Sequence, residues 1–532
     1  MNPKKCILYR KRFQLLAFLL TMITPSCIDF DDNINPNEAT EDMMEVDNLK
    51  TGAFFSQMLK NVVIINDGKH LDSDYQVGQN LSHDLYAGYC AATLGSCDHN
   101  GQYNIREEWT NVTFNFAYTG IMSPWLSLHK LAQEQNLPEV DALATVVKVA
   151  GMHRIADTFG PIPYVNFGSS NLYDSLDKIY EQFFKELDQS IEVLGNYVSG
   201  NSDAKLMSDY DYVYAGDVSK WVKFANTLRL RLAVRISYAN KELAQQEAEK
   251  SIKNIYGLIE TAADRAQLQH SLLEYHHPIQ EIAYNFNAGD TRPCASIVQY
   301  MVDLNDPRIS YYFTPAADDG EYHGVRVGID TENVSGYQGG KISNFNMNRT
   351  STPVVWMTAA ESFFLRAEGA LRGWNMGGDA KTFYEKGVKA SFEEVGAPDV
   401  EAYLSDTEST PKQFTDNVGS DGYQFTSKVT PAWDENADFE SKLEHIITQK
   451  WIAIYPDGPE GWSEYRRTGY PELIPVVKNR NSGVIDTELQ IRRLPYTKDE
   501  KLNNAEGVNS GISALGGSDT GGTKLWWDQR ER

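Results

Sequence analysis

The chain has 532 residues, of which 23% are charged and 41% hydrophobic, and its formal net charge at pH 7 is −24. That length exceeds one ordinary domain and allows a large core. Because nucleic-acid binding needs the opposite sign of charge, we expect no nucleic-acid partner.

The first 26 residues have the organisation of a secretory signal. Five basic residues and no acidic one precede position 13, and residues 13–23 are almost wholly apolar. As a helix, that apolar run rises about 16 Å, which is too short for a hydrocarbon core of about 30 Å. We therefore expect residues 1–26 to be a removable signal peptide.

A cysteine follows the signal directly. Residues 24–26 read Thr-Pro-Ser and run into Cys27, which resembles the lipobox of bacterial lipoproteins. The resemblance implies that Cys27 becomes a lipid-modified N-terminus with more than one acyl chain, such as palmitate, as stable anchoring requires. The alternative is a secreted protein with a chance cysteine.

The residues after Cys27 are expected to form a tether. Residues 27–48 are acidic, rich in Asn and nearly free of aliphatic side chains, so they cannot bury enough surface to order on their own. One domain is expected over residues 49–532. Within it, Cys90 and Cys97 are close enough to close a short disulfide loop, a pairing that the sequence leaves open.

Helical periodicity recurs along the rest of the chain. Apolar residues return at spacings of three and four within 140–160, 175–197 and 217–240, which predicts helices packed on neighbours. The segments 355–373 and 379–396 are separated only by WNMGG and have the size of one tetratricopeptide unit. The sequence therefore predicts an all-α-dominated fold, a tetratricopeptide-like scaffold of divergent helical repeats.

Three long polar stretches interrupt these helices, at about 66–115, 262–353 and 396–438. Segments of this kind tend to hold binding surfaces. Aromatic rings among Gly, Asn and Asp offer flat apolar faces beside hydrogen-bonding groups, which suit sugars and peptides. For any single ring the alternative is that it pins its loop to the helical body. The candidate ligand-binding residues are Tyr86, Tyr103, Trp109, Tyr322 and Tyr337.

Patterns for metal or catalytic chemistry are not found in the sequence. It contains no His-Glu-x-x-His pair, EF-hand loop, Gly-x-Ser-x-Gly elbow or phosphate-binding glycine loop. We expect no metal site and no cofactor, and we leave calcium binding open. His276 and His277 precede a proline and are expected to be solvated loop residues. Glu107 and Glu108 are adjacent, so they diverge by about 100° on a helix and cannot by themselves form the carboxylate couple of a glycosidase.

A series of short motifs extends along nearly the whole chain. They are DTFGPIPY at 157–164, KWVKFANTLRLRLAVRIS at 220–237, LNDPRISYYF at 304–313, ESFFLRAEGALRG at 361–373, QKWIAIYPDGPEGWSEYRRTGYPEL at 449–473, RRLPYTKDE at 492–500 and WWD at 526–528. Each is weak alone, but their shared order is specific. Together with Cys27 they resemble the SusD/RagB family of outer-membrane nutrient-binding lipoproteins.

The resemblance implies a helical body that carries a loop-rich ligand-binding lobe. Members of that family are not enzymes: they sit on the cell surface over a TonB-dependent (SusC-like) transporter barrel and pass glycans, or in some branches peptides, into it. It therefore implies a lipid-anchored protein of the outer membrane that faces the cell exterior. Asp29, Asp31 and Asp32 resemble the acidic surface-export signal that follows the lipidated cysteine in this family.

The matched motifs belong mostly to the scaffold, so no position inherits a ligand-binding role from them. Arg466 and Arg467 are expected to pair with helix carboxylates or loop carbonyls. Two alternatives to a binding protein stay open. One is a lipid-anchored glycoside hydrolase in which distant carboxylates converge, and the other is a protein that only stabilises a transporter complex.

Overall fold

The protein is described by a computed structural model, which covers residues 49–93, 99–200, 203–286, 289–329, 335–416, 418 and 422–530. The chain divides after Lys50, and Thr51–Arg532 form one compact unit, to which the following description refers. The expected signal peptide, Cys27, the acidic residues of the tether and Cys97 lie outside the described residues.

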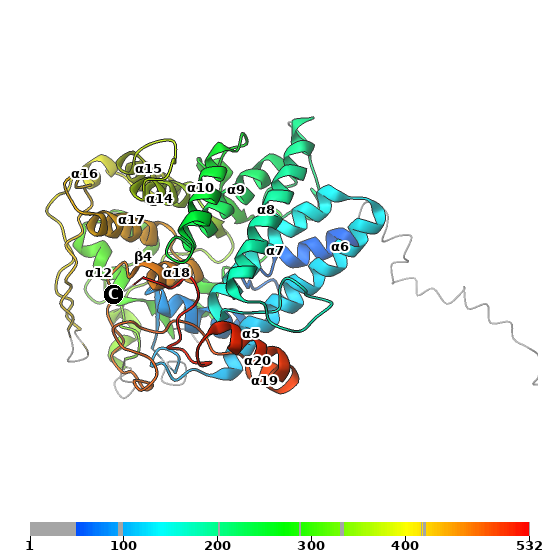
Figure 1. Ribbon diagram of the computed structural model, residues 1–532. Coiled ribbons are helices and arrows are strands. Elements are labelled where there is room, and N and C mark those ends of the chain that lie inside the picture. The colour runs from blue at the N-terminus through cyan, green and yellow to red at the C-terminus, as the bar shows by residue number, and fades with distance from the viewer. Residues whose placement is uncertain are drawn as a thin grey trace, which may run out of the picture. The chain divides into compact units, whose positions relative to one another are not determined.

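Helices dominate this unit (Figure 1), which confirms the predicted fold class. The longer ones are α3 (Leu49–Leu59), α5 (Glu107–Ala117), α6 (Ser123–Gln135), α7 (Pro138–Phe159), α8 (Leu176–Ser199), α9 (Val218–Arg235), α10 (Lys241–Lys253), α14 (Ala359–Leu371), α15 (Ala380–Val395), α17 (Phe439–Ala453), α18 (Gly458–Thr468) and α20 (Ala505–Leu515). The shorter ones are α4 (Asp72–Tyr75), η3 (Gln76–Asp84), η4 (Tyr118–Met122), η5 (Ala262–Asp264), α11 (Pro278–Tyr284), α12 (Ala295–Asp303), α13 (Ile309–Tyr312), η7 (Gly339–Lys341), α16 (Val400–Leu404) and α19 (Lys498–Asn503).

The strands that the structure describes are short and form antiparallel two-stranded pairs. The pairs are β1 (Cys90–Ala92) with β3 (Thr291–Pro293), β2 (Ala266–Leu268) with β6 (Val354–Met357), and β4 (Phe313–Thr314) with β5 (Asn344–Phe345). Each pair joins segments that are far apart in sequence. The β1–β3 pair thereby joins the polar stretches 66–115 and 262–353, and the β2–β6 pair joins the second stretch to the residues directly before α14.

Consecutive long helices pack on each other, as the periodicity predicts. Contacts run from α7 to α8, from α8 to α9 and from α9 to α10, and α14 contacts α9, α15 and α17. Figure 1 shows α7 to α10 side by side. Helix α9 is buried along nearly its whole length, because it has helices on several sides.

The predicted helix at 355–373 begins later than expected. Residues Val354–Met357 form strand β6, since their β-branched and aromatic side chains suit a ladder with β2. Helix α14 then starts after Thr358, whose side chain accepts a hydrogen bond from the backbone N–H of Glu361 at 3.2 Å. The helix pair itself, α14 with α15, is confirmed.

The polar stretches contain more helix than the sequence indicates. Residues 66–115 include α4, η3 and most of α5, and residues 262–353 include α11, α12 and α13. These helices are short and carry many polar residues, so their apolar spacing is too brief to be recognised. Tertiary contacts stabilise them instead.

A network of buried ion pairs joins the helices that carry the sequence motifs. Arg231 of α9 binds Glu361 of α14, with N–O distances of 2.8 and 2.5 Å. Arg235 binds Glu460 of α18, which also accepts from Lys450 of α17 at 2.9 Å. All these side chains are at most 2% exposed, so each charge depends on its partner in place of water.

The two adjacent arginines of α18 are held as the sequence predicts. Arg467 binds Glu368 at 2.5 and 2.6 Å and Glu464 at 2.6 Å. Arg466 donates to the backbone carbonyls of Asp157 at 2.6 Å and Arg492 at 2.9 Å. Both guanidinium groups are buried, so these motif residues have a structural role.

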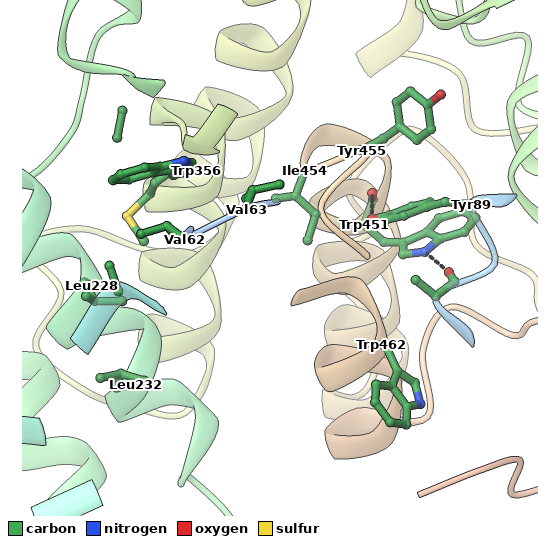
Figure 2. Packing of buried hydrophobic residues seen from close by; sticks show 14 of the residues in the cluster. Val62, Val63, Tyr89, Leu228, Leu232, Trp356, Trp451, Ile454, Tyr455 and Trp462 are labelled. Atoms are coloured by element: carbon green, nitrogen blue, oxygen red, sulfur yellow. Dashed lines mark hydrogen bonds between the residues drawn. The ribbon is translucent and has the colours of Figure 1, made fainter. Parts of the chain in front are cut away.

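Core contacts also join residues 87–89 to α17. The rings of Tyr89 and Trp451 stack with centroids 5.4 Å apart, as Figure 2 shows. Trp451 Nε1 donates to the carbonyl of Ala87 at 2.7 Å, and Tyr89 Oη donates to the carbonyl of Trp451 at 2.6 Å. In the described part of the chain, no helix is both long and apolar enough to span a bilayer.

Candidate ligand-binding site

A cavity of about 550 Å³ lies where three segments distant in sequence meet. Two of the segments, α12 and the chain before β5, lie in the polar stretch 262–353, and the third lies in the stretch 396–438. The lining residues used below are Gln299 of α12, Asp318, Asp319, Tyr322, His323, Gly324, Tyr337, Lys341, Phe414 and Asp416.

The first wall is fixed by backbone contacts to the start of α12. The backbone N–H of Ala295 donates to the carbonyl of Val325 at 2.7 Å, and Val325 N–H donates to the carbonyl of Pro293 at 2.9 Å. A Cβ on Gly324 would stand 2.6 Å from Ala295 Cα. Only glycine allows this approach, so the loop and the helix hold one relative position.

Two of the predicted aromatic residues, Tyr322 and Tyr337, line this cavity together. Tyr337 is 5% exposed, and its hydroxyl donates to Asp416 Oδ2 at 2.6 Å. Asp416 Oδ1 accepts from the backbone N–H of Val418 at 2.9 Å, which fixes the carboxylate. Tyr322 is the more exposed of the two, and partial burial raises the pKa of its phenol. The phenol is therefore neutral and available to a ligand.

Polar groups surround these rings. Asp319 accepts from the backbone N–H of Glu321 at 3.0 Å and pairs with His323 at 2.8 Å, and these two hydrogen bonds lower the pKa of Asp319. Asp318 is exposed, and Lys341 lies on the same wall. Carboxylates, a cation and phenols beside aromatic faces are the groups that bind hydroxyl-rich or amide-rich ligands.

The other three predicted aromatic residues lie elsewhere. Tyr86 and Tyr103 are 2% and 0% exposed, and the ring of Tyr86 packs 5.2 Å from that of Trp462. Both are buried in the core and neither lines the cavity. Trp109 is partly buried on α5 under the guanidinium of Arg106, 5.0 Å from its ring centroid, and it does not line the cavity. We therefore keep only Tyr322 and Tyr337 in the candidate site.

Several lining residues were not singled out from the sequence. Phe414 and Asp416 lie in the stretch 396–438, which was recognised as a whole, and Gln299 lies on a helix that was not predicted. The polar composition of residues 396–438 identifies the stretch as a candidate binding surface. Which of its side chains face a cavity depends on the packing of α12, which the sequence does not show.

Of the two adjacent histidines, His277 differs from the expectation. It is 3% exposed, and burial lowers its pKa to about 3, so it is neutral. It is the N-cap residue of α11, directly before Pro278. Glu107 and Glu108 are exposed on the first turn of α5.

The described cysteines and acidic groups show no metal cluster. Cys90 and Cys294 are buried and do not pair with each other. Cys97 lies outside the described residues, so its pairing with Cys90 stays a prediction. Among the residues that the structure places, no three His, Cys, Asp or Glu side chains gather to hold a metal ion.

Comparisons with known proteins agree with one another. A family model described as "SusD-like: Susd and RagB outer membrane lipoprotein" matches residues 31–528. No protein with a curated description matches the chain.

Solved structures of similar proteins cover nearly the whole chain. A chitin-binding SusD homolog from Flavobacterium johnsoniae is 38% identical, with a TM-score of 0.85 over 90% of this chain and 98% of that one. A SusD homolog from Bacteroides uniformis is 37% identical, with a TM-score of 0.82 over 90% and 99%. A third, from Bacteroides vulgatus, is 34% identical, with a TM-score of 0.83 over 90% and 98%.

Proposed function

Because this chain belongs to the SusD-like family of outer-membrane lipoproteins, we propose that it is a lipid-anchored nutrient-binding protein of the cell surface. Its ligands are oligosaccharides, with peptides as the second class. It captures them in the cavity lined by Tyr322 and Tyr337 and delivers them to a TonB-dependent transporter barrel.

The observation that carries this proposal is the cavity itself. It combines two tyrosines with Asp318, Asp416 and Lys341. A sugar ring needs both an apolar face to stack on and hydrogen-bonding groups around its edge. The similar protein from Flavobacterium johnsoniae is chitin-binding, which makes chito-oligosaccharides the first ligands to test.

Localisation rests on the N-terminal sequence and the family. Cys27 would carry the lipid and residues 28–48 would form the tether, with Asp29, Asp31 and Asp32 as the export signal. A lipid anchor at this position would hold the compact unit at the membrane surface.

Isothermal calorimetry with purified protein tests the binding role. We expect at least one member of a panel of chito-oligosaccharides, other glycans and peptides to bind, and Tyr322→Ala to weaken binding roughly tenfold, or about 1.4 kcal/mol. Trp109→Ala is the matched control, since Trp109 is also a partly buried aromatic residue but lies outside the cavity. Equal affinities in both variants would place the ligand elsewhere, and no binding across the panel would contradict the proposal.

The same mixtures of protein and ligand also test the two alternative functions, a glycoside hydrolase and a protein that only stabilises a transporter complex. Release of sugar product, abolished by Asp416→Asn, would identify a glycoside hydrolase. Co-purification with a transporter barrel in the absence of any ligand affinity would identify a protein that only stabilises the complex.

A further inference from the structure

A second cavity, of about 270 Å³, lies among α13, β6, the start of α14 and the end of α17. It shares no lining residue with the first cavity. Its walls include the rings of Tyr311, Tyr312, Trp356 and Tyr455. Tyr311 is 39% exposed, whereas Trp356 is 2% exposed, so the cavity extends from the surface into the core.

Buried polar atoms of this lining lack partners. Trp356 Nε1, Tyr455 Oη, His277 Nδ1 and Arg265 Nε are buried without a hydrogen bond to any described residue. Trp356, His277 and Tyr455 are themselves 2%, 3% and 8% exposed. In Figure 2, Ile454, which also lines the cavity, lies between Trp356 on one side and Tyr455 on the other. Since buried polar atoms are nearly always satisfied in proteins, this cluster indicates a missing partner.

The charges of the lining leave one cation uncompensated. Glu361 is neutralised by Arg231, and Asp457 by Arg154 at 2.7 Å. His277 is neutral, as described above. Burial raises the pKa of Glu394 to about 7, so this carboxyl is largely protonated below neutral pH.

Arg265 is the remaining charged group of the lining. No ion pair joins it to a described carboxylate, although its charge acts on the carboxyl of Glu394, which lies on the same lining. Arginine stays protonated in proteins. The cavity therefore presents a positive charge and unpaired N–H donors beside aromatic walls.

We propose that this second cavity binds a small ring compound that carries a carboxylate. The carboxylate would accept hydrogen bonds from Arg265 and from the indole N–H of Trp356, neither of which can act as an acceptor. The ring would lie against Tyr311 and Tyr312. The volume is far larger than one water molecule needs, and aromatic walls favour an organic occupant over water alone.

Calorimetry on the purified full-length chain tests this proposal with matched probes. Glucuronate and benzoate carry a carboxylate on a ring, whereas glucose and benzyl alcohol are their neutral counterparts. We expect at least one carboxylate to bind and its neutral counterpart not to bind. Absence of binding by both carboxylates, or equal binding of the neutral compounds, would overturn the proposal and would indicate that water satisfies these atoms.

Variants locate the site. Arg265→Gln should weaken carboxylate binding roughly tenfold, and Trp356→Phe should weaken it while keeping a ring in the core. Arg106→Gln, which changes an exposed arginine outside the cavity, should have no effect. Unchanged affinity in Arg265→Gln would contradict the site, provided that circular dichroism shows the variants folded.

Titration gives an independent check. The other ionisable side chains on this lining, besides its tyrosines, are Arg265, His277, Glu361 and Asp457. Glu394 becomes anionic as the pH rises through about 7, so carboxylate affinity should fall over this range. The fall should disappear in Glu394→Gln, and a persistent fall would contradict the assignment. Tyr322→Ala, in the first cavity, should leave carboxylate binding at the second cavity intact. A failure of this proposal can therefore be told apart from a failure of the proposed function.

Discussion

At the scale of single residues, Arg467 shows how charge is used inside this protein. Its guanidinium is fully buried between Glu368 and Glu464. A buried ion pair contributes little net stability compared with apolar residues in place of the whole pair. Loss of one partner is costly, however, because the remaining charge is buried with neither a partner nor water. The pairs thus specify how α14 and α18 meet.

Replacement of Arg467 should therefore be costly. We expect Arg467→Met to lower the free energy of unfolding by about 3–5 kcal/mol, because two buried carboxylates each lose one of their cationic partners. The control is Lys389→Met, which removes a surface pair with Glu401 whose side chains are 44% and 76% exposed; it should change stability by at most about 1 kcal/mol. Urea unfolding followed by circular dichroism measures both, and equal effects would contradict a role for burial.

Buried histidines make stability depend on pH. The pKa of His83 is lowered from 6.5 to about 3, first by burial and then by Arg466. Below pH 6.5 the His83 imidazole binds a proton in the unfolded chain but not in the folded chain. The contribution of His83 is therefore complete above pH 6.5 and is lost as the pH falls toward 3.

This titration is measurable as a difference between two proteins. Between pH 7 and pH 5, the unmodified chain should lose about 2 kcal/mol more than His83→Gln. Asp84 and Glu394 have raised pKa values and act in the opposite direction, but they are present in both proteins and cancel. Parallel pH profiles from denaturant titration would show that His83 is not buried as a neutral group.

The same scale shows where sequence reasoning reaches its limit. Tyr86 and Tyr322 both lie in polar stretches, yet one packs against Trp462 in the core and the other lines the cavity. Local composition is similar around both. Only the packing of distant segments decides which ring keeps an accessible face.

At the scale of elements, long helices were predictable and short ones were not. The apolar spacing within 140–160, 175–197 and 217–240 corresponds to α7, α8 and α9. Helices α4, α11 and α13 have four to seven residues, which is too few for periodicity to stand out. Strand β6 was assigned to a helix because pairing with β2 overrides its local pattern.

The contact between α14 and α15 depends on a glycine. Gly387 of α15 faces the ring of Phe364, and a Cβ there would stand 2.8 Å from the ring. Phe364 is fully buried and its ring is packed against that of Tyr384, so it has little room to withdraw. Close approach of the two helices therefore requires the absence of a side chain.

Substitution of Gly387 with alanine has two effects of opposite sign, one on helix propensity and one on packing. Alanine favours a helix by up to about 1 kcal/mol, but we expect Gly387→Ala to destabilise the protein by about 1–3 kcal/mol through overpacking. Gly200→Ala, at the end of α8 with nothing within 4 Å of its Cβ position, should be neutral within about 0.5 kcal/mol. Thermal unfolding compares them, and a stabilising Gly387→Ala would show that the helices are less closely packed.

At the scale of the whole molecule, function depends on segments that only the fold brings together. The candidate site combines α12, the chain before β5 and residues 414–416. The family was recognisable because scaffold motifs recur in order, whereas the ligand residues belong to no motif. The sequence therefore identifies the class of protein and the stretches that line the candidate site, but not the ligand.

We attribute membrane attachment to Cys27, which lies outside the described residues. Cys27→Ala removes the residue that would carry the lipid, so we expect the variant to appear in the soluble fraction while the unmodified protein stays with outer membranes. Cell fractionation and immunoblotting measure this. A variant that still fractionates with membranes would contradict Cys27 as the anchor.

The central claim is that a nutrient binds between the walls formed by Tyr322 and Tyr337. Hydrogen–deuterium exchange of the full chain, with and without a glycan identified by calorimetry, tests it most directly. We predict slower exchange in peptides from residues 316–329, 335–343 and 412–416, with the helices α7 to α10 unchanged. Protection confined to α7 to α10, with no change beside Tyr322 and Tyr337, would contradict the account.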